Sequence, residues 1–440
     1  MTNALYLGID FGTSGARAIA IDCQSTPCAD ARLTFADVST TALPQLWQES
    51  LFALLQKIPE ATRQRVKAIA INGTSATVLR CDGKGQPLDA PMLYNDSRGR
   101  SLLHILDALI PPDPTDPTRA VAMSATSSLV KLLWWTCADA VANRALQPPE
   151  YFLHQADWLG FLLHGQLGVS DYHNSLKLGY DVGNLCYPDW MARIPTPMVL
   201  PRVVAPGTPV GTVQGAIASQ YHLPADCLVC AGTTDSIAAF LASGAHQPGT
   251  AVTSLGSTLV LKLLSTTRVD DSRFGIYSHR LGDLWLVGGA SNTGGAALKA
   301  FFSDDELATL SQKIPCEQES PLDYYPLTQP GERFPVSDPT LSPRLEPRPD
   351  DPVAFLHGLL ESIARIEALG YRRLQELGAT PLRTVLTAGG GAQNEAWSAI
   401  RQRHLGVKVG RSRYTEAAHG SARLAQQGLI EWATSKAATR

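Results

Sequence analysis

The sequence predicts an α/β fold made of two similar lobes with a cleft between them. Strand-like apolar runs alternate with helical segments along 440 residues, which is enough chain for two or three domains. A pattern of strand, Gly/Ser/Thr turn and strand at residues 5–22 occurs again at residues 250–264. An internal repeat of this kind indicates two similar lobes, and ligands most often bind in the cleft between such lobes.

The composition is that of a globular protein and narrows the class of ligand. Hydrophobic residues make up 44% and charged residues 18% of the chain, which excludes a disordered protein. The net charge is −3 and there is no basic block, so we expect no nucleic-acid partner. No apolar run of about 18 residues is present that would span a membrane. The sequence carries no signal of an oligomeric state.

The cysteines and the N-terminus predict a cytoplasmic protein. The eight cysteines are scattered, and the one C-x-x-C motif, Cys227 to Cys230, lies in a predicted strand. Residues three apart on a strand point to opposite faces, which suits neither a redox turn nor a metal site. No secretory segment precedes the first strand, so we expect reduced thiols in the cytoplasm, or in a plastid-type stroma if a transit peptide was removed.

Residues 5–22 (LYLGIDFGTSGARAIAID) are predicted to form a β-hairpin whose tip binds phosphate. The tip reads Gly12-Thr13-Ser14-Gly15 and is followed by Arg17. Glycines let backbone N–H groups approach an anion, and the two hydroxyls add donors. Asp10 ends the first strand, where a carboxylate would suit a metal that accompanies a nucleotide. The alternative is an ordinary hairpin turn.

The rest of the first lobe, placed at residues 1–225, is read from periodicity and turn residues. The expected elements are a helix at 45–58, strands at 66–71 and 77–80, helices at 126–146 and 153–164, and a polar loop at 170–181. A proline-rich break covers residues 111–118. Residues 194–211 contain five prolines and are the best candidate for a linker between the lobes.

The second lobe is placed at residues 226–440. Its expected elements, after a helix at 213–221, are a strand at 226–235, helices at 236–243 and 353–377, a strand-to-helix run at 284–301, a strand and glycine turn at 385–394, and a final helix at 415–428. Residues 321–352 are proline-rich and predicted to be irregular.

The second hairpin makes the first one more informative. Its tip reads Gly256-Ser257-Thr258. Two such tips facing one another can hold a polyphosphate through backbone N–H groups and hydroxyls. The P-loop pattern and a GxGxxG after the first strand are both absent, so a nucleotide would be bound by this other device.

Asp235 is the candidate catalytic residue. It follows a strand ending in Gly232-Thr233-Thr234 and precedes a helix. At that place it would point into the cleft and accept a hydroxyl proton, which is the kind of base that phosphoryl transfer needs. The alternative is a helix N-cap aspartate, which is common.

Three other groups are weaker candidates. Asn95 and Asp96, with Arg98, would hydrogen-bond a polyol, or else form a solvated turn. The glycine run that ends in Asn394, and the glycine pairs at 288–289 and 294–295, let backbone approach a flat ring, or else form tight turns. The ten histidines are dispersed, and no His/Cys cluster has metal-ligand spacing.

Six segments, in order, resemble the FGGY carbohydrate kinases, a branch of the actin-like ATPase superfamily. They are GIDFGTSGAR; SLVKLLW at residues 128–134; LPRVVAPGTPVG…LPADCLVCAGTTDSIAA; PGERFPVSDP; FLHGLLESIARI; and AGGGAQNEAW. The second segment departs from the family signature at the next residue, Trp135. The resemblance covers nearly the whole chain.

The resemblance implies two ribonuclease-H-like (actin-like ATPase) lobes, and ATP-dependent transfer of the γ-phosphoryl to a terminal hydroxyl of a sugar or polyol with Mg²⁺. Asp10 would organise the magnesium through water, and Asp235 would take the hydroxyl proton. The residues expected to hold ATP are Gly12, Thr13, Ser14, Arg17, Gly256, Ser257, Thr258, Gly294, Gly295, Gly390, Gly391 and Asn394. Those expected to bind sugar are Asp10, Ser75, Asn95, Asp96 and Asp235. Lobe closure would exclude water.

The segment after the strand at 66–71 bears on the substrate. It reads Thr74-Ser75-Ala76, where glycerol kinases of the family carry an Arg-Glu pair and xylulose kinases carry Gln-Met-His. The missing charges argue against glycerol, and the missing imidazole puts D-xylulose in doubt. The chain is also shorter than ribulokinases acting on L-ribulose. It most resembles the short cyanobacterial and plant xylulose-kinase-like proteins, so D-ribulose, phosphorylated at its C5 hydroxyl, is the expected substrate, with D-xylulose second.

Two other functions remain open. An actin-like ATP-binding module acting as a sensor or chaperone-type switch would carry the same hairpins. Against a chaperone, Asp235 is kept and no β-rich peptide-binding domain follows the last helix. A kinase that has lost sugar phosphorylation and retains only slow ATP hydrolysis is the third possibility.

Overall fold

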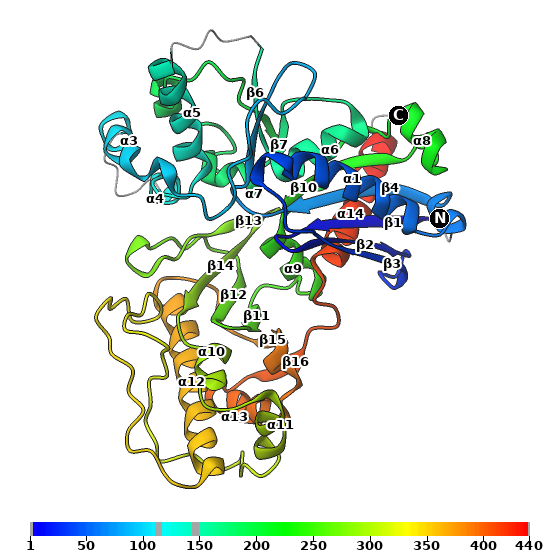
Figure 1. The fold of residues 1–440 in the computed structure, drawn as a ribbon. Helices are drawn as coiled ribbons and strands as arrows, with labels where there is room; N and C mark the ends of the chain where they lie inside the picture. The colour runs from blue at the N-terminus through cyan, green and yellow to red at the C-terminus, as the bar shows by residue number, and fades with distance from the viewer. Residues whose placement is uncertain (1–2, 111–116, 143–148, 439–440) are drawn as a thin grey trace. The chain divides into compact units, whose positions relative to one another are not determined.

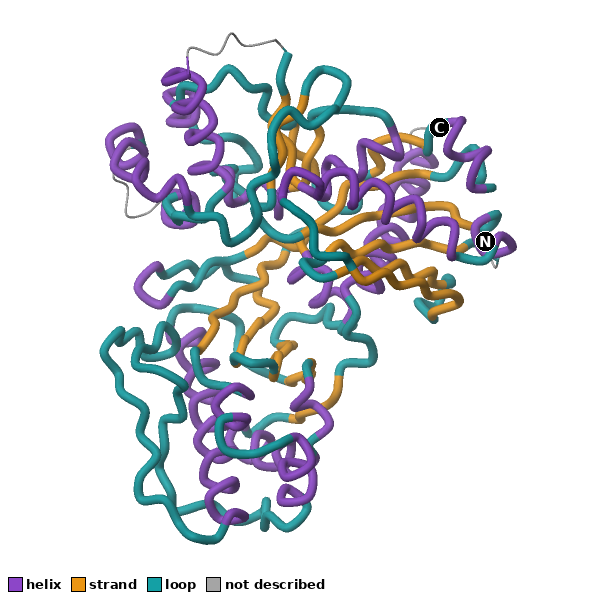
Figure 2. The backbone as a smooth tube through the Cα atoms, viewed as in Figure 1, coloured by secondary structure: helices purple, strands orange, loops and turns teal. Residues whose placement is uncertain are grey.

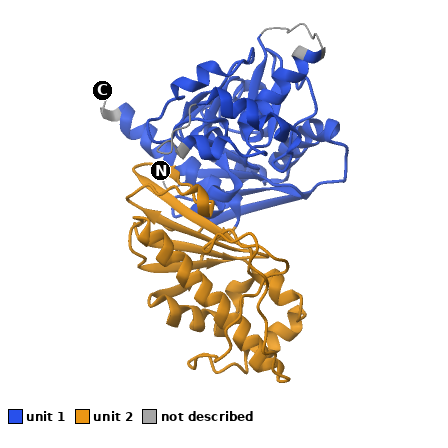
Figure 3. Cartoon of the chain, turned by 90° about the vertical axis from the view of Figure 1, so that its left-hand side faces the viewer, with its two compact units in different colours: residues 1–242, 416–440 blue, residues 243–415 orange. Residues whose placement is uncertain are grey.

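The computed structural model describes residues 3–110, 117–142 and 149–438, which divide into two compact units (Figure 3). Unit 1 comprises Met1–Ala242 and Glu416–Arg440, and unit 2 comprises Ser243–Thr415. This division differs from the expected boundary after residue 225. The strand β10 (Leu228–Thr234) pairs with β4 (Val66–Gly73) and therefore belongs to the first sheet, together with Asp235.

The main sheet of unit 1 has the strand order β3-β2-β1-β4-β10-β9. Its remaining strands are β1 (Leu5–Phe11), β2 (Gly15–Ile21), β3 (Pro27–Thr34) and β9 (Pro209–Thr212). β1 and β2 pair in antiparallel fashion, so the predicted opening hairpin is confirmed. β4 is parallel to both β1 and β10, and the carboxyl ends of these three strands therefore meet at one edge.

Helices cover both faces of this sheet (Figure 1). On one face, α1 (Leu43–Lys57), α6 (Gln155–His164) and α8 (Gly215–Tyr221) bury apolar side chains against it. On the other face the C-terminal helix α14 (Ala417–Ala438) packs against the strands, and α9 (Asp235–Ala242) packs against α14. Cys227 and Cys230 fall into the cores on opposite faces, as their spacing predicts.

A second core in unit 1 lies beside this sheet. It is built from β5 (Val78–Cys81), β6 (Tyr151–His154), α3 (Leu103–Leu109), α4 (Pro117–Ala122) and α5 (Ser128–Ala142). The predicted helix at 126–146 is confirmed as far as Ala142, and residues 143–146 lie outside the described residues, as do residues 111–116 of the predicted break. The short helix α2 (Glu60–Arg63) precedes β4.

The predicted polar loop at 170–181 is wrong. This segment contains β7 (Val169–Asp171), α7 (Tyr172–Ser175) and a 3₁₀ turn at Leu176–Leu178. The carboxylate of Asp171 accepts hydrogen bonds from the backbone N–H groups of His173 and Asn174, which starts the helix. Most residues of this segment are buried rather than exposed on a loop.

The proline-rich segment 194–211 is not the link between the units. It contains β8 (Arg202–Val204), which pairs with β7, and most of β9, both inside unit 1. β9 is an edge strand that begins with Pro209, and edges are where a sheet tolerates proline. The chain passes between the units at Ala242–Ser243 and returns at Thr415–Glu416.

The sheet of unit 2 has the order β13-β14-β12-β11-β15-β16. Its strands are β11 (Thr250–Leu255), β12 (Leu259–Ser265), β13 (His279–Leu281), β14 (Leu284–Ser291), β15 (Thr384–Ala388) and β16 (Lys408–Arg411). β14, β12 and β11 are antiparallel, whereas β11, β15 and β16 are parallel. This is the arrangement of β3, β2, β1, β4 and β10 in unit 1, so the predicted internal repeat is confirmed.

Helices and a long irregular segment complete unit 2 (Figure 2). The helices are α10 (Gly295–Lys299), α11 (Asp304–Ser311), α12 (Pro352–Glu376) and α13 (Glu395–Leu405). α12 carries an apolar face that is buried along most of its length, as its sequence periodicity predicts. Residues 321–351 form neither helix nor strand, which agrees with their proline content.

Candidate active site

Polar side chains gather at the edge of unit 1 where the three parallel strands end. Asp10 on β1 lies opposite Asn72 on β4, and Asn72 lies opposite Thr233 on β10. Asp235 is the first residue of α9, directly after β10. The crevice outside the carboxyl ends of parallel strands is where open α/β sheets bind ligands. The topology thus makes this edge the first candidate site.

The electrostatics of this edge favour a positive charge. Burial raises the pKa of Asp10 to about 7, and the negative charges of Asp235 and Glu416 contribute to the rise, while Arg17 opposes it. Glu416 immediately precedes α14, at the point where the chain re-enters unit 1. A cation here would relieve the repulsion between these carboxylates.

Asp235 is the first residue of α9 and lies within its first turn. Its carboxylate accepts a hydrogen bond from the backbone N–H of Ser236 at 2.6 Å, within the first turn of α9. It is also only partly buried, and its charge acts on Asp10. Close by on β10, the hydroxyl of Thr233 lies 2.7 Å from Nδ1 of the buried His173.

Two buried polar atoms at this edge have no hydrogen-bond partner among the described residues. They are Oδ1 of Asn72 and Oγ1 of Thr234. The amide nitrogen of Asn72 donates to Ser421 Oγ at 2.8 Å, so this side chain is fixed with its oxygen unpaired. Buried polar groups are nearly always paired in folded proteins, so such atoms mark a place where a ligand or water supplies the partner.

The opening hairpin has a tight, exposed tip. The N–H of Gly12 donates to the carbonyl of Gly15 at 3.0 Å, and Thr13 and Ser14 between them are exposed. A Cβ on Gly15 would lie 2.4 Å from the carbonyl oxygen of Leu33, so glycine is required where β3 passes. The tip therefore offers two exposed hydroxyls on a turn that is closed by a backbone hydrogen bond.

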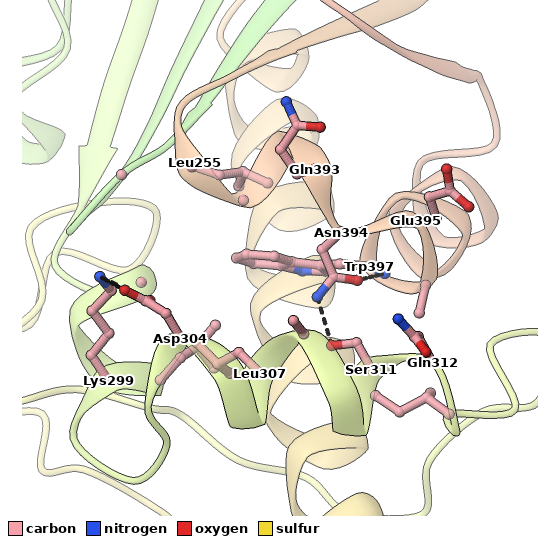
Figure 4. A pocket seen from close by; sticks show the side chains of 18 of the residues that line it. Leu255, Lys299, Asp304, Leu307, Ser311, Gln312, Gln393, Asn394, Glu395 and Trp397 are labelled. Atoms are coloured by element: carbon pink, nitrogen blue, oxygen red, sulfur yellow. Dashed lines mark hydrogen bonds and ion pairs between the residues drawn. The ribbon is translucent and has the colours of Figure 1, made fainter.

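Unit 2 contains a cavity of about 1140 Å³. It lies between the second hairpin tip, α10, α11, the 3₁₀ turn at Gly390–Gln393 and the start of α13 (Figure 4). The residues that line it include Gly256, Ser257, Gly295, Gly390, Gly391 and Asn394. This volume is slightly above the usual range of small-molecule and cofactor sites, which is about 300–1,000 Å³.

Backbone contacts lock the second hairpin tip to the start of α10. The N–H groups of Gly295 and Ala296 donate to the carbonyls of Gly256 and Ser257 at 2.8 and 3.0 Å. Gly294 has φ +144°, and a Cβ there would lie 2.7 Å from the backbone of Thr258. Glycine is thus required at 294 by both conformation and space. Gly294 and Thr258 form the support behind the tip, whereas Gly256 and Ser257 face the cavity.

Asn394 joins two walls of the cavity. Its oxygen accepts a hydrogen bond from the N–H of Trp397 at 2.9 Å, which caps α13. Its amide nitrogen donates to Ser311 Oγ at 2.8 Å, at the end of α11, as Figure 4 shows. Gly391 packs against Trp397, whereas a Cβ on Gly390 would meet nothing within 4 Å. The glycine turn is therefore open on one side.

Comparison with known proteins decides the family. Residues 5–242 match the N-terminal domain, and residues 251–427 the C-terminal domain, of the FGGY family of carbohydrate kinases. The chain belongs to the FGGY carbohydrate kinase family. The enzyme is therefore an ATP-dependent sugar kinase, and its two units carry the actin-like ATPase fold that the sequence predicted.

Individual FGGY relatives are distant. The xylulose kinase of Streptomyces coelicolor is 25% identical, over 92% of this chain and 84% of its own length. An L-fuculokinase of Salmonella typhi is 22% identical, over 93% of this chain and 89% of its own length.

Solved FGGY structures share the fold. The crystal structure of xylulose kinase from Rhodospirillum rubrum superimposes with a TM-score of 0.79 at 21% identity, over 96% of this chain and 90% of that one. The structure of Plasmodium falciparum glycerol kinase with ADP gives a TM-score of 0.79 at 17% identity, over 98% of this chain and 90% of that one. At these identities the match concerns the fold alone.

The residues expected to bind sugar in this kinase lie in unit 1. Ser75 is partly buried in the turn that follows β4, beside the Asp10 edge. Asn95 is exposed, and Asp96 forms an ion pair with Arg98 at 2.6 Å. Burial would raise the pKa of Asp96, but hydrogen bonds and charge from Arg98 lower it overall. Asp96 is thus an anion held in place by a neighbour.

Arg17, expected to contact ATP, is engaged within the fold. It lies opposite Asp10 in the hairpin and forms ion pairs with Asp30, at 2.6 Å, and with Glu416. It thereby links β2 to β3 and to the segment that leads into α14. The positive charge of Arg17 also opposes the rise in the pKa of Asp10.

The chemistry of the Asp10 edge fits a magnesium ion. Among the described residues, no group of three or more His, Cys, Asp or Glu side chains is close enough to hold a metal by itself. Mg²⁺ in kinases is usually bound by one or two carboxylates, water and the phosphates of the substrate. Asp10, whose carboxylate is crowded by other negative charges, meets that requirement.

Several residues of these sites were not predicted from the sequence. Asn72 and Thr233 meet through strand pairing, and His173 on α7 reaches Thr233 through its side chain. The sequence placed Asn72 and Thr233 at strand ends, which was the one hint of a role. Glu416 reaches Arg17 from 399 positions along the chain, for which no local signal exists. The contribution of α11 to the cavity was also missed, although Ser303 and Glu306 form a capping box that marks its start.

No helix in the described part of the chain is both long and apolar enough to cross a membrane.

Proposed function

We propose that this kinase transfers the γ-phosphoryl group of ATP to the C5 hydroxyl of a ketopentose, with D-ribulose as the preferred acceptor. Asp235 acts as the general base that takes the hydroxyl proton as the oxygen attacks in line. The observation that carries the proposal is the placement of Asp235 beside Asp10, at the edge where β1, β4 and β10 end.

The phosphoryl donor is assigned to the glycine-rich elements. The cavity of unit 2, with Gly390, Gly391 and Asn394 on its walls, is large enough for an adenosine group. Backbone N–H groups and hydroxyls at residues 12–14 and 256–258 would hold phosphates. Gly294 and Gly295 support the second of these turns through the contacts described above.

Mg²⁺ is assigned to Asp10. When bound with ATP, the ion neutralises charge on the transferring phosphoryl group. Asp10 lies at the edge of the sheet, and Arg17, its partner on the neighbouring strand β2, forms an ion pair with Glu416. Asp10 is thus placed to organise the ion and its water without forming a closed cage.

The acceptor is assigned to the polar residues of unit 1. Ser75 offers a small hydroxyl in the turn that follows β4, and Asn95 with Asp96 offers an amide and a carboxylate for sugar hydroxyls. The turn carries neither the charged pair expected for glycerol nor the imidazole expected for D-xylulose. D-xylulose remains the second candidate, because several relatives, such as that of Streptomyces coelicolor, are xylulose kinases.

A substrate panel tests this proposal. ADP release by the purified enzyme would be measured with ATP and Mg²⁺ against D-ribulose, D-xylulose, L-ribulose, L-fuculose, glycerol and aldopentoses. We expect the highest kcat/KM with D-ribulose, and product analysis should find the phosphate on C5. A higher value with D-xylulose would reverse the order of the two candidates. A uniform response at the level of sugar-free hydrolysis would refute the assignment to ketopentoses.

A further inference from the structure

A buried lysine joins the two segments that carry the assigned sugar-binding residues. Lys131 lies on α5 and its side chain is 0% exposed. Its ammonium group donates one hydrogen bond to the carbonyl of Ala76 at 2.7 Å and another to the carbonyl of Leu93 at 2.6 Å. Ala76 follows Ser75 directly, and Leu93 lies two and three residues before Asn95 and Asp96.

A lysine at this place is costly for the fold. Its helix neighbours Leu129, Val130, Leu132 and Leu133 are fully buried and apolar. Burial lowers the pKa of Lys131 to about 7, although the charge of Asp96 opposes this shift. An unbranched apolar side chain would pack here without the cost of burying an ammonium group. What the lysine provides instead is a pair of hydrogen bonds to two separate turns.

The first turn is held under constraint from two sides. The N–H of Thr74 donates to Gln155 Oε1 at 2.9 Å, and the hydroxyl of Thr74 contacts that of Thr77. Ala76 is fully buried at φ +61°, in the left-handed region that favours glycine. Gln155 thus fixes the start of the turn and Lys131 fixes its end, with Ser75 between them.

The second turn is tied to the same helix at two points. The carbonyl of Leu93 accepts the N–H of Asp96 at 3.0 Å in addition to the bond from Lys131. Asp96 pairs with Arg98, and the guanidinium of Arg98 lies over the ring of Trp134, 5.1 Å from its centre. Trp134 stands three residues after Lys131 on α5, so this helix fixes both the backbone and the charge of the turn.

We propose that Lys131 is a positioning residue that sets the spacing between Ser75 and Asp96, and through it the affinity of the kinase for its acceptor sugar. The proposal rests on the assignment of these two residues to sugar binding. Both of the hydrogen bonds described for Lys131 go to backbone carbonyls, so the role proposed for it is to hold the two turns rather than to react. Its loss would let the two turns separate while the nucleotide cavity of unit 2 stays intact.

Substitution of Lys131 tests the proposal through separate kinetic constants. Lys131→Met keeps the length of the side chain and removes both donors, and Lys131→Arg keeps the charge and the donors. Lys57→Met, at the exposed end of α1, is the matched control. For each variant we would measure Tm, kcat, the KM for the active ketopentose, the KM for ATP and sugar-free ATP hydrolysis.

For Lys131→Met we expect the KM for the ketopentose to rise at least tenfold, with the KM for ATP and sugar-free hydrolysis within twofold of wild type. Lys131→Arg should recover part of the sugar affinity, and Lys57→Met should match wild type. A sugar KM within twofold of wild type for Lys131→Met, or a parallel rise of both KM values, would overturn the proposal.

The remaining outcomes are also decisive. If Lys131→Met does not fold, Lys131→Gln, which keeps one amide donor, takes its place with the same criteria. If none of the three variants folds, the lysine serves the core and the proposal is wrong. If wild type shows no ketopentose-dependent turnover, the proposed function fails first and this inference fails with it. Normal wild-type turnover with an unaffected Lys131→Met refutes the positioning role alone.

Discussion

The negative charge of Asp235 raises the pKa of Asp10, and the two carboxylates stand at the ends of β10 and β1 in one sheet. The strand between them, β4, carries Asn72 and leads to Ser75. Asp235, Asp10 and Ser75, to which we assign the roles of base, magnesium-organising carboxylate and sugar-binding hydroxyl, thus lie at the ends of three neighbouring parallel strands. This arrangement leads to predictions for each part of the site.

Asp10→Asn should stabilise the metal-free, nucleotide-free protein at high pH. The pKa of Asp10 is about 7 in the fold and near 4 when unfolded, so the fold binds the additional proton between these values. Wild type should therefore lose stability as the pH rises from about 4 to about 7. At pH 8 the variant should be more stable by about 1–4 kcal/mol, and at pH 4 the two should be alike.

Urea unfolding in a chelating buffer at pH 4 to 8 measures this effect. Asp37→Asn, at an exposed position of unit 1, serves as the control and should follow wild type. If the stability of Asp10→Asn changed with pH in parallel with wild type, the pKa of Asp10 would not be the cause of the pH dependence. The variant should also be inactive, because the ion would lose its carboxylate.

Ser75→Ala should weaken acceptor binding. The hydroxyl lies in a turn that is fixed on both sides, so its removal leaves the backbone in place and takes away one hydrogen bond to the sugar. We expect a rise of about tenfold in the KM for the ketopentose, or ~1.4 kcal/mol, with an unchanged KM for ATP. Ser219→Ala on the exposed face of α8 is the control. Initial-rate kinetics with either substrate varied would check this.

Gly390→Leu should block the nucleotide cavity without unfolding the protein. A Cβ at Gly390 meets nothing within 4 Å, and the residue lines the cavity. We expect the Kd for ATP to rise tenfold or more, equivalent to about 1.4 kcal/mol, with little change in Tm. Gly215→Leu is a matched control, since a Cβ at that exposed position also meets nothing within 4 Å. Unaltered ATP binding by calorimetry would place the adenosine site elsewhere.

Two substitutions of Asn394 should separate its structural role from its place in the cavity wall. Asn394→Asp keeps the oxygen that caps α13 but loses the donor to Ser311, whereas Asn394→Ala loses both. The alanine variant should lose about 1 kcal/mol of stability, and the aspartate variant should lose less. Both should bind ATP more weakly than wild type. Equal stability of the two variants in urea would contradict the capping role.

The sequence predicted the parts of this protein that depend on local pattern. The hairpins at residues 5–22 and 250–264 combine apolar runs with glycine turns, and both form as expected. Their repetition predicted two similar units, which the matching strand orders confirm. Asp235 was singled out because it follows a strand and precedes a helix, and because the resemblance to the FGGY family places the catalytic aspartate there.

Other features depend on contacts between distant segments and left little trace in the sequence. The return of residues 416–440 to unit 1 brings Glu416 to Arg17 and Asp10, and no local property of residue 416 announces it. Residues 170–181 are polar yet mostly buried, and the hydrogen bonds that Asp171 accepts from His173 and Asn174 start a helix there. Lys131 stands among apolar residues of a predicted helix, but the sequence gives no sign of its burial or of its two acceptor carbonyls.

The most direct test of the account is ketopentose-dependent turnover by Asp235→Asn beside its binding of ATP. Asp235 belongs to unit 1, and the cavity that we assign to ATP belongs to unit 2. A substitution of the proposed base should therefore leave ATP binding unchanged. We predict that kcat with D-ribulose falls by about 10²–10⁴-fold, while the Kd for ATP stays within a factor of about two. Near-normal turnover by Asp235→Asn would contradict the central claim that Asp235 is the base.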